Sequence, residues 1–131
     1  MGKFEMEAKT FSITNAAVPA TGLTAVGTVL CHGHYTTLVF EAANTGVALQ
    51  DFELQIQPHE DASFHTYITG AGWDATTNMV KPFTSDTDLD TLPDGEAEGA
   101  YVLLGPVYAI KFLAQAASTT TSITIVGTLF R

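Results

Sequence analysis

Residues 35–58 show the clearest alternation of apolar and polar positions in the chain. Leu38 and Phe40 occupy every second position before a turn at 44–46, and Phe52 and Leu54 do so after it. Successive side chains of a β-strand point to opposite faces, so this pattern is typical of strands with one buried and one solvated face. The Asn and Gly of the turn tolerate positive φ. We therefore predict a long antiparallel hairpin at 35–58, at the centre of the fold.

Alternation, β-branched residues and turn signals predict further strands along the rest of the chain. They span 8–18, 23–31, 63–68, 79–83, 100–104, 107–116 and 122–130. Short strands at intervals of roughly 8–12 residues, with little helix, are typical of an antiparallel sandwich. We predict an all-β fold, an antiparallel β-sandwich of jelly-roll-like character with eight or nine strands. Its core is expected to bury Phe40, Leu54, Ile56, Ile110, Phe112 and Ile125.

A chain of 131 residues is long enough for one domain with its own core. We divide it into an N-terminal arm at 1–10 and a single β-sandwich domain at 11–131. Residues 69–99 form one long loop without periodicity, apart from a short helical turn expected at 75–79 and an edge strand around Pro82. A loop of this length in a compact domain is usually functional or packed against a neighbour.

The charge balance narrows the choice of partners. Fourteen acidic and five basic residues give a net charge of −9. The basic residues are scattered, so the basic surface that binds nucleic acid is missing, and we expect no nucleic-acid partner. Charged residues make up 15% of the chain, against about 25% in an average protein. Thr and Ala take their place, a composition that suits a surface partly covered by neighbouring molecules.

Cysteine usage and hydropathy exclude further classes of protein. The single cysteine, Cys31, excludes an internal disulfide. The sequence shows no signal peptide. It also has no apolar run of the ~20 residues that a membrane helix needs. We therefore expect synthesis in the cytoplasm and no membrane partner.

Cys31, His32 and His34 form a first candidate metal site. A zinc site needs a third and a fourth ligand, for which His59 and His65 remain. Neither lies at a spacing typical of zinc ligands, so we interpret this group as polar residues at the end of a strand.

Four aspartates of the long loop form a second candidate, which resembles a calcium-binding loop: Asp86, Asp88, Asp90 and Asp94. An EF-hand loop that starts at Asp86 requires Gly at its sixth position and Glu at its twelfth. Thr91 and Ala97 occupy these positions. We therefore expect a solvated acidic loop, no bound metal and no cofactor.

The sequence contains no catalytic motif. Asp61, Ser63 and His65 include the residue types of a nucleophilic triad. Neighbours along one strand do not reach triad geometry merely by being close in sequence. We expect no enzymatic activity.

Large apolar residues outside the main strand pattern are the candidate interface residues. They are Phe4, Met6, Trp73, Met79 and Phe83. Trp73 lies between glycine and aspartate, where an exposed indole would anchor a protein interface or stack on a sugar. The alternative is that Trp73 covers one end of the core.

The order of these segments resembles small β-sandwich virion proteins of tailed bacteriophages, of the type that decorates or cements capsids. The segments NTGVALQDFELQ and LPDGEAEGAYVLLGPVYAIKFLAQA carry the resemblance, which covers about residues 23–130. It implies synthesis in the host cytoplasm, oligomers on the capsid surface of the virion, a mechanical role and no cofactor. The implied partners are the major capsid protein and copies of the same chain. The alternative function is a carbohydrate-binding or lectin-like module of a head or tail fibre, with Trp73 and Tyr67 as sugar platform.

Overall fold

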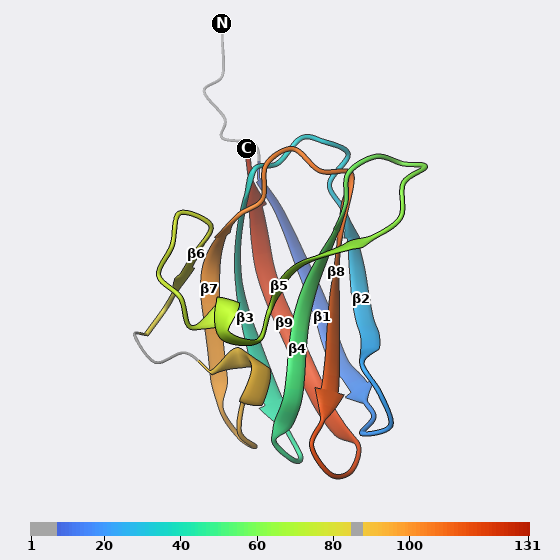
Figure 1. Cartoon of the computed structure of the whole chain (residues 1–131), viewed down its shortest axis with the longest axis vertical. Coiled ribbons are helices and arrows are strands. Elements are labelled where there is room, and N and C mark those ends of the chain that lie inside the picture. Colours follow the sequence, from blue (N-terminus) through green and yellow to red (C-terminus); the bar gives the residue numbers. More distant parts are fainter. Residues whose placement is uncertain (1–7, 85–87) are drawn as a thin grey trace, which may run out of the picture.

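The computed structural model of the chain describes residues 8–84 and 88–131 (Figure 1). These residues form nine strands and two short 3₁₀ helices. In chain order they are β1 (Ala8–Val18), β2 (Thr24–Leu30), β3 (Thr37–Thr45), β4 (Leu49–Gln57), β5 (His65–Thr69), η1 (Gly70–Trp73), β6 (Val80–Pro82), η2 (Leu89–Thr91), β7 (Ala97–Leu103), β8 (Ala109–Ala116) and β9 (Thr121–Phe130). No helix in this part of the chain is long and apolar enough to cross a membrane.

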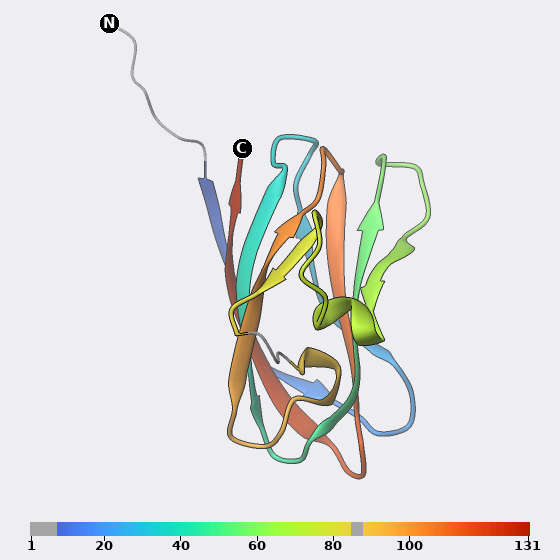
Figure 2. The ribbon, with the colours of Figure 1, turned by 60° about the vertical axis from the view of Figure 1, so that its left-hand side comes forward.

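The strands form two antiparallel sheets that face each other (Figure 2). The five-stranded sheet has the order β1-β9-β3-β7-β6, and the four-stranded sheet has the order β2-β8-β4-β5. Without the short edge strand β6, each sheet has four strands, and the chain passes repeatedly from one sheet to the other, as in a jelly roll. The prediction of an all-β antiparallel sandwich is confirmed.

The prediction of a hairpin at 35–58 is wrong, because its two strands lie in opposite sheets. β3 pairs with β7 and β9, whereas β4 pairs with β5 and β8. Alternation indicates which face of a strand is buried, but two strands that face each other across a core alternate just as a hairpin does. Phe40 and Phe52 illustrate this, since their rings stack across the core with centroids 6.1 Å apart.

The first strand takes up part of the predicted arm. Ala8, Lys9 and Thr10 begin β1 and pair with the end of β9. The rest of the predicted arm, residues 1–7, lies outside the described residues.

The predicted long loop at 69–99 contains regular structure at both ends and in its middle. The expected edge strand around Pro82 is β6, which pairs with β7. The helical turn forms at Gly70–Trp73 rather than at 75–79, and β7 already starts at Ala97. The predicted long loop is therefore divided by η1, β6 and η2 into shorter connections.

Aromatic side chains fill the space between the sheets. The buried rings of Phe40, Phe52, Phe112 and Trp73 are in mutual contact, with neighbouring centroids 5.2 to 6.1 Å apart. The indole Nε1 of Trp73 donates a hydrogen bond to the carbonyl of Phe52 across 2.6 Å. The other predicted core residues are buried too, except Ile56 near the end of β4, which is partly buried.

Candidate functional site

The outer face of the five-stranded sheet is the surface that departs most from an ordinary solvated sheet. Strand register aligns its outward residues in rows across the sheet. One row contains Thr10, Thr128, Val39, Tyr101 and Lys81, and the next contains Ser12, Val126, Glu41 and Gly99. Glu41 is the single charged residue that points outward from β9, β3 and β7, all three of which the structure describes completely. Solvated surfaces normally carry charged residues at about 25–35% of their positions.

Large hydrophobic side chains collect on the same face. Among the described residues, six large hydrophobic side chains are exposed, and five of them belong to this sheet or its β6 edge. These five, together with the half-buried Val39, define what we call the apolar face: Val39, Met79, Phe83, Tyr101, Leu103 and Val126. Exposed apolar surface gathered in one place is typical of an interaction site, whereas single exposed residues are not.

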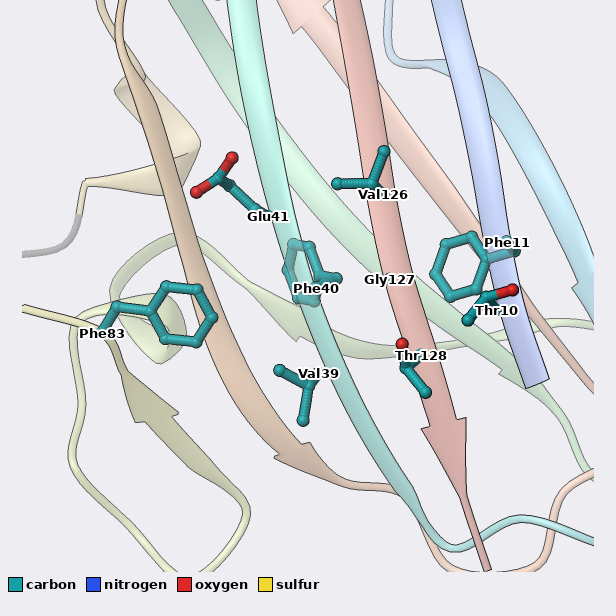
Figure 3. A pocket seen from close by; sticks show the side chains of 9 residues that line it. All are labelled: Thr10, Phe11, Val39, Phe40, Glu41, Phe83, Val126, Gly127 and Thr128. Atoms are coloured by element: carbon teal, nitrogen blue, oxygen red, sulfur yellow. The ribbon is translucent and has the colours of Figure 1, made fainter. Parts of the chain in front are cut away.

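A shallow hollow of about 390 Å³ lies in the middle of this face (Figure 3). Val39, Val126 and Thr128 surround it, with Glu41 at one end and the ring of Phe83 at the side. A smaller hollow of about 160 Å³ lies at the β6 edge. The two hollows are open enough to receive apolar side chains of a partner.

Gly99 leaves room for the ring of Phe83 against the sheet. A Cβ at position 99 would collide with the carbonyl of Phe40 and with the Phe83 ring. Phe83 in turn contacts Tyr101, with ring centroids 5.3 Å apart and an interplanar angle of 66°. The sequence therefore builds an exposed aromatic pair over β7.

The outer face of the four-stranded sheet has a different character. Its β4 residues are Asp51, Glu53, Gln55 and Gln57. Glu53 accepts hydrogen bonds from the Gln55 side-chain amide and the Thr66 hydroxyl. The ammonium of Lys111 lies 3.9 Å from the ring centroid of Phe64. These polar contacts within the molecule indicate an ordinary solvated face.

The predicted interface residues fall into three groups. Met79 and Phe83 are exposed and lie on the apolar face, and their role in an interface stays a prediction. Trp73 is fully buried, so the prediction that it contacts a partner is wrong for this structure, and it covers the core instead. Phe4 and Met6 lie outside the described residues.

The other members of the apolar face were not predicted from the sequence. Val39, Tyr101, Leu103 and Val126 all lie in predicted strands, at positions that alternate with buried residues. This alternation indicates that the four side chains point outward. It does not indicate that they lie next to one another, because that depends on the order of the strands in the sheet.

Three aspartates approach one another where η1 and η2 meet. Asp74, Asp88 and Asp90 each offer an oxygen within 4.8 Å of the others, and are the one group of this kind among the described residues. Burial, followed by the charge of Asp88, raises the pKa of the Asp90 carboxyl above its ordinary value. Burial and the charges of Asp90 and Asp88 likewise raise the pKa of Asp74. Asp90 Oδ1 is buried and accepts no hydrogen bond.

This group differs from the calcium loop considered from the sequence. Asp74 was not foreseen, because it comes from the other side of β6 in the chain. Asp94 lies elsewhere and accepts a hydrogen bond from the backbone N–H of Gly46 across 2.8 Å. Asp86 lies outside the described residues.

The residues considered for zinc do not come together. Cys31 is buried, and this burial raises the pKa of its thiol to about 11, which keeps it protonated. His32 and His34 are exposed, and each contacts a tyrosine ring edge-on. No group of three potential ligands in the described part of the chain includes any of these residues.

The fold and this face define a class, a jelly-roll β-sandwich with one charge-poor, apolar sheet surface. The sequence matches no protein family model and no curated protein. Among solved structures, the chain is similar to the SPBc2 prophage-derived protein YomS, with a TM-score of 0.61 and 11% sequence identity over 100% of this chain and 99% of that one. At this identity the likeness concerns the fold alone.

Proposed function

We propose that the chain is a non-enzymatic structural protein of a bacteriophage virion, a decoration or cement protein on the capsid surface. The apolar face is the observation that carries this proposal, because it offers a binding surface for protein rather than a site for chemistry. The jelly-roll fold supports the proposal, since viral capsid domains use this architecture. The prophage origin of YomS, which shares the fold, supports it too.

A cement protein works by adding buried surface that must be lost before the shell opens. Apolar area contributes about 25 cal/mol per Å² when it is removed from water. The apolar face supplies such area without the desolvation of many charges, because Glu41 is its one carboxylate on the central strands. Its partners would be the major capsid protein and further copies of this chain.

The carbohydrate-binding alternative finds no support at the residues considered for it. Trp73 is buried, and the Tyr67 hydroxyl donates a hydrogen bond to the carbonyl of Leu103. The exposed pair of Phe83 and Tyr101 is not coplanar, since its rings meet at 66°. A flat aromatic platform for a sugar is therefore missing at these four residues.

Particle binding tests the proposal directly. Purified protein is sedimented with capsids of the phage that encodes it, assembled without this chain, and shell opening is followed against temperature. We expect the wild-type protein and Thr28→Asp to bind and to raise the opening temperature, because Thr28 lies on the other sheet. Tyr101→Asp is expected to abolish both effects. Wild-type protein that neither binds nor stabilises the shells would exclude a decoration function.

A further inference from the structure

The apolar face carries two opposite charges, one on each side of its aromatic centre. Glu41 projects from β3 opposite Gly99, and Lys81 projects from β6 opposite Tyr101. Residues directly opposite each other in an antiparallel pair share one face of the sheet, so both charges point outward with Tyr101. Between them lies β7, covered by the rings of Phe83 and Tyr101.

These two charges do not neutralise each other within one copy. Two strand spacings and a two-residue offset separate their Cα atoms by about 12 Å. Neither side chain has an ion-pair partner among the described residues. A partner that covers this face must therefore supply a cation to Glu41 and an anion to Lys81, because a buried unpaired charge is costly.

We propose that a second copy of this chain covers the face, so that Glu41 of each copy pairs with Lys81 of the other. In a two-fold interface, a contact of residue i with residue j is repeated as a contact of j with i. A two-fold axis that lies in the interface midway between Glu41 and Lys81 creates both ion pairs at once. It also brings Phe83 and Tyr101 of one copy against the same residues of the other.

The charge of the whole molecule favours this arrangement over other contacts between copies. Each copy carries a net charge of −9, so most approaches of two copies are repulsive. On the apolar face, the opposite charges of Glu41 and Lys81 cancel. On the four-stranded sheet, by contrast, β4 carries Asp51 and the largely buried Glu53, against the single cation Lys111 of β8.

The size of the face is sufficient for a dimer of moderate affinity. Strands about 4.8 Å apart with about 3.4 Å of rise per residue give the outer face an area of roughly 600 Å². A standard protein–protein interface takes about 800 Å² from each partner. We therefore expect a dimer whose population depends on protein concentration. This inference deepens the proposed function and rests on the same surface, so dimerisation and capsid binding through the apolar face compete for it.

Charge reversal tests the pairing by sedimentation velocity of the full-length chain over a concentration series. Wild-type protein is expected to dimerise. Glu41→Lys and Lys81→Glu, each alone, are expected to raise the dissociation constant at least about tenfold, because each places like charges together. The double variant is expected to recover the wild-type constant. An equimolar mixture of E41K and K81E is expected to form a heterodimer, since both of its ion pairs are attractive again.

A control variant separates the effect of the ion pairs from that of net charge. Glu60→Lys changes the net charge as E41K does, but on the loop after β4, and is expected to leave dimerisation unchanged. Circular dichroism establishes that each variant is folded, and the mixture provides rescue without any further mutation. A wild-type monomer at all concentrations, single variants that dimerise normally, or a mixture that stays monomeric would each overturn the inference. If the wild-type protein is monomeric and still binds capsids, the dimer inference is wrong and the proposed function stands. If it forms a charge-dependent dimer and binds no capsid, the proposed function is wrong and the dimer inference stands.

Discussion

The hydroxyl of Thr121 donates a hydrogen bond to the side-chain oxygen of Asn44 across 2.8 Å, and both residues are buried. The Asn44 amide nitrogen donates to the carbonyls of Val47 and Leu92. Asn44 thus joins the passage from β3 to β4, the segment after η2 and the start of β9. This network holds the connection between the sheets where a hairpin turn was predicted.

Asn44→Ala is expected to lower the free energy of unfolding by about 3 kcal/mol, because buried groups left without a partner cost ~1–3 kcal/mol each. Urea unfolding followed by circular dichroism measures the change. Asn78→Ala, at an exposed position, is the matched control and is expected to stay within about 0.5 kcal/mol of wild type. Equal values for the two variants would show that the network does not hold the fold.

Phe112 lies at the centre of the aromatic core, in contact with Phe40 and Phe52. Phe112→Ala is expected to cost about 3–5 kcal/mol, since it removes apolar contacts and leaves a cavity. Thermal and urea unfolding measure this loss. Leu30→Ala removes an exposed side chain and serves as the control. A cost for Phe112→Ala no greater than that of the control would contradict the packing described.

The carboxylates around Asp90 predict a specific dependence of stability on pH. Because the pKa of Asp90 is raised in the folded state, the folded protein binds more protons than the unfolded one between the ordinary carboxyl pKa and the raised value. The free energy of unfolding contributed by this group therefore falls as pH rises through that window. Asp90→Asn is expected to melt at a higher temperature than wild type at pH 7. The difference should shrink as pH falls below the window.

Calorimetry of both proteins between pH 3 and pH 8 checks this expectation, with Asp61→Asn in the exposed loop before β5 as the control. A lower melting temperature for Asp90→Asn at pH 7 would instead show that the ionised carboxylate stabilises the fold.

Metal removal is expected to have no effect on stability. The three aspartates come from two separate segments, on either side of β6, and neither segment has the residue pattern of an EF-hand loop, which supplies the fixed set of ligands that calcium needs. The melting temperature of the full chain is measured in matched buffers with chelator and with calcium. A rise of several degrees with calcium that Asp90→Asn abolishes would prove the expectation wrong.

Deletion of residues 1–7 is expected to leave the melting temperature of the isolated protein nearly unchanged and to weaken assembly. The described pairing of β1 with β9 begins at Ala8 and Phe130, so the deletion removes none of it. Assembly is expected to weaken because the deletion removes the apolar side chains of Phe4 and Met6, which are predicted to contact a neighbour. Calorimetry and capsid sedimentation of the truncated chain separate the two effects. A large loss of thermal stability with unchanged capsid binding would show that these residues belong to the core.

The sequence predicted the buried faces of the strands because that information is local. Phe40 and Leu54 could be assigned to the core from neighbours two positions away, without knowledge of any other strand. Strand neighbours could not be assigned, since β3 pairs with β7 and β9 far along the chain. Asn44 shows the difficulty, because an Asn before a Gly predicts a tight turn, whereas its buried side chain serves a connection between sheets.

The candidate surface was predictable only in part, for the same reason. Met79 and Phe83 can be recognised in the sequence as large apolar residues within a polar segment. Val39 and Tyr101 lie on different strands and become neighbours only through the β3–β7 register. Trp73 was misassigned because its flanking residues are those of an exposed loop, although its indole lies in the core.

The short strand β6 protects one edge of the five-stranded sheet from pairing with a strand of another molecule. A free sheet edge can template one strand after another, which leads to open-ended fibres. At this edge of the five-stranded sheet, β6 offers three residues, and Pro82 has no N–H to donate. Addition of a strand from another molecule is therefore blocked at this edge of the sheet.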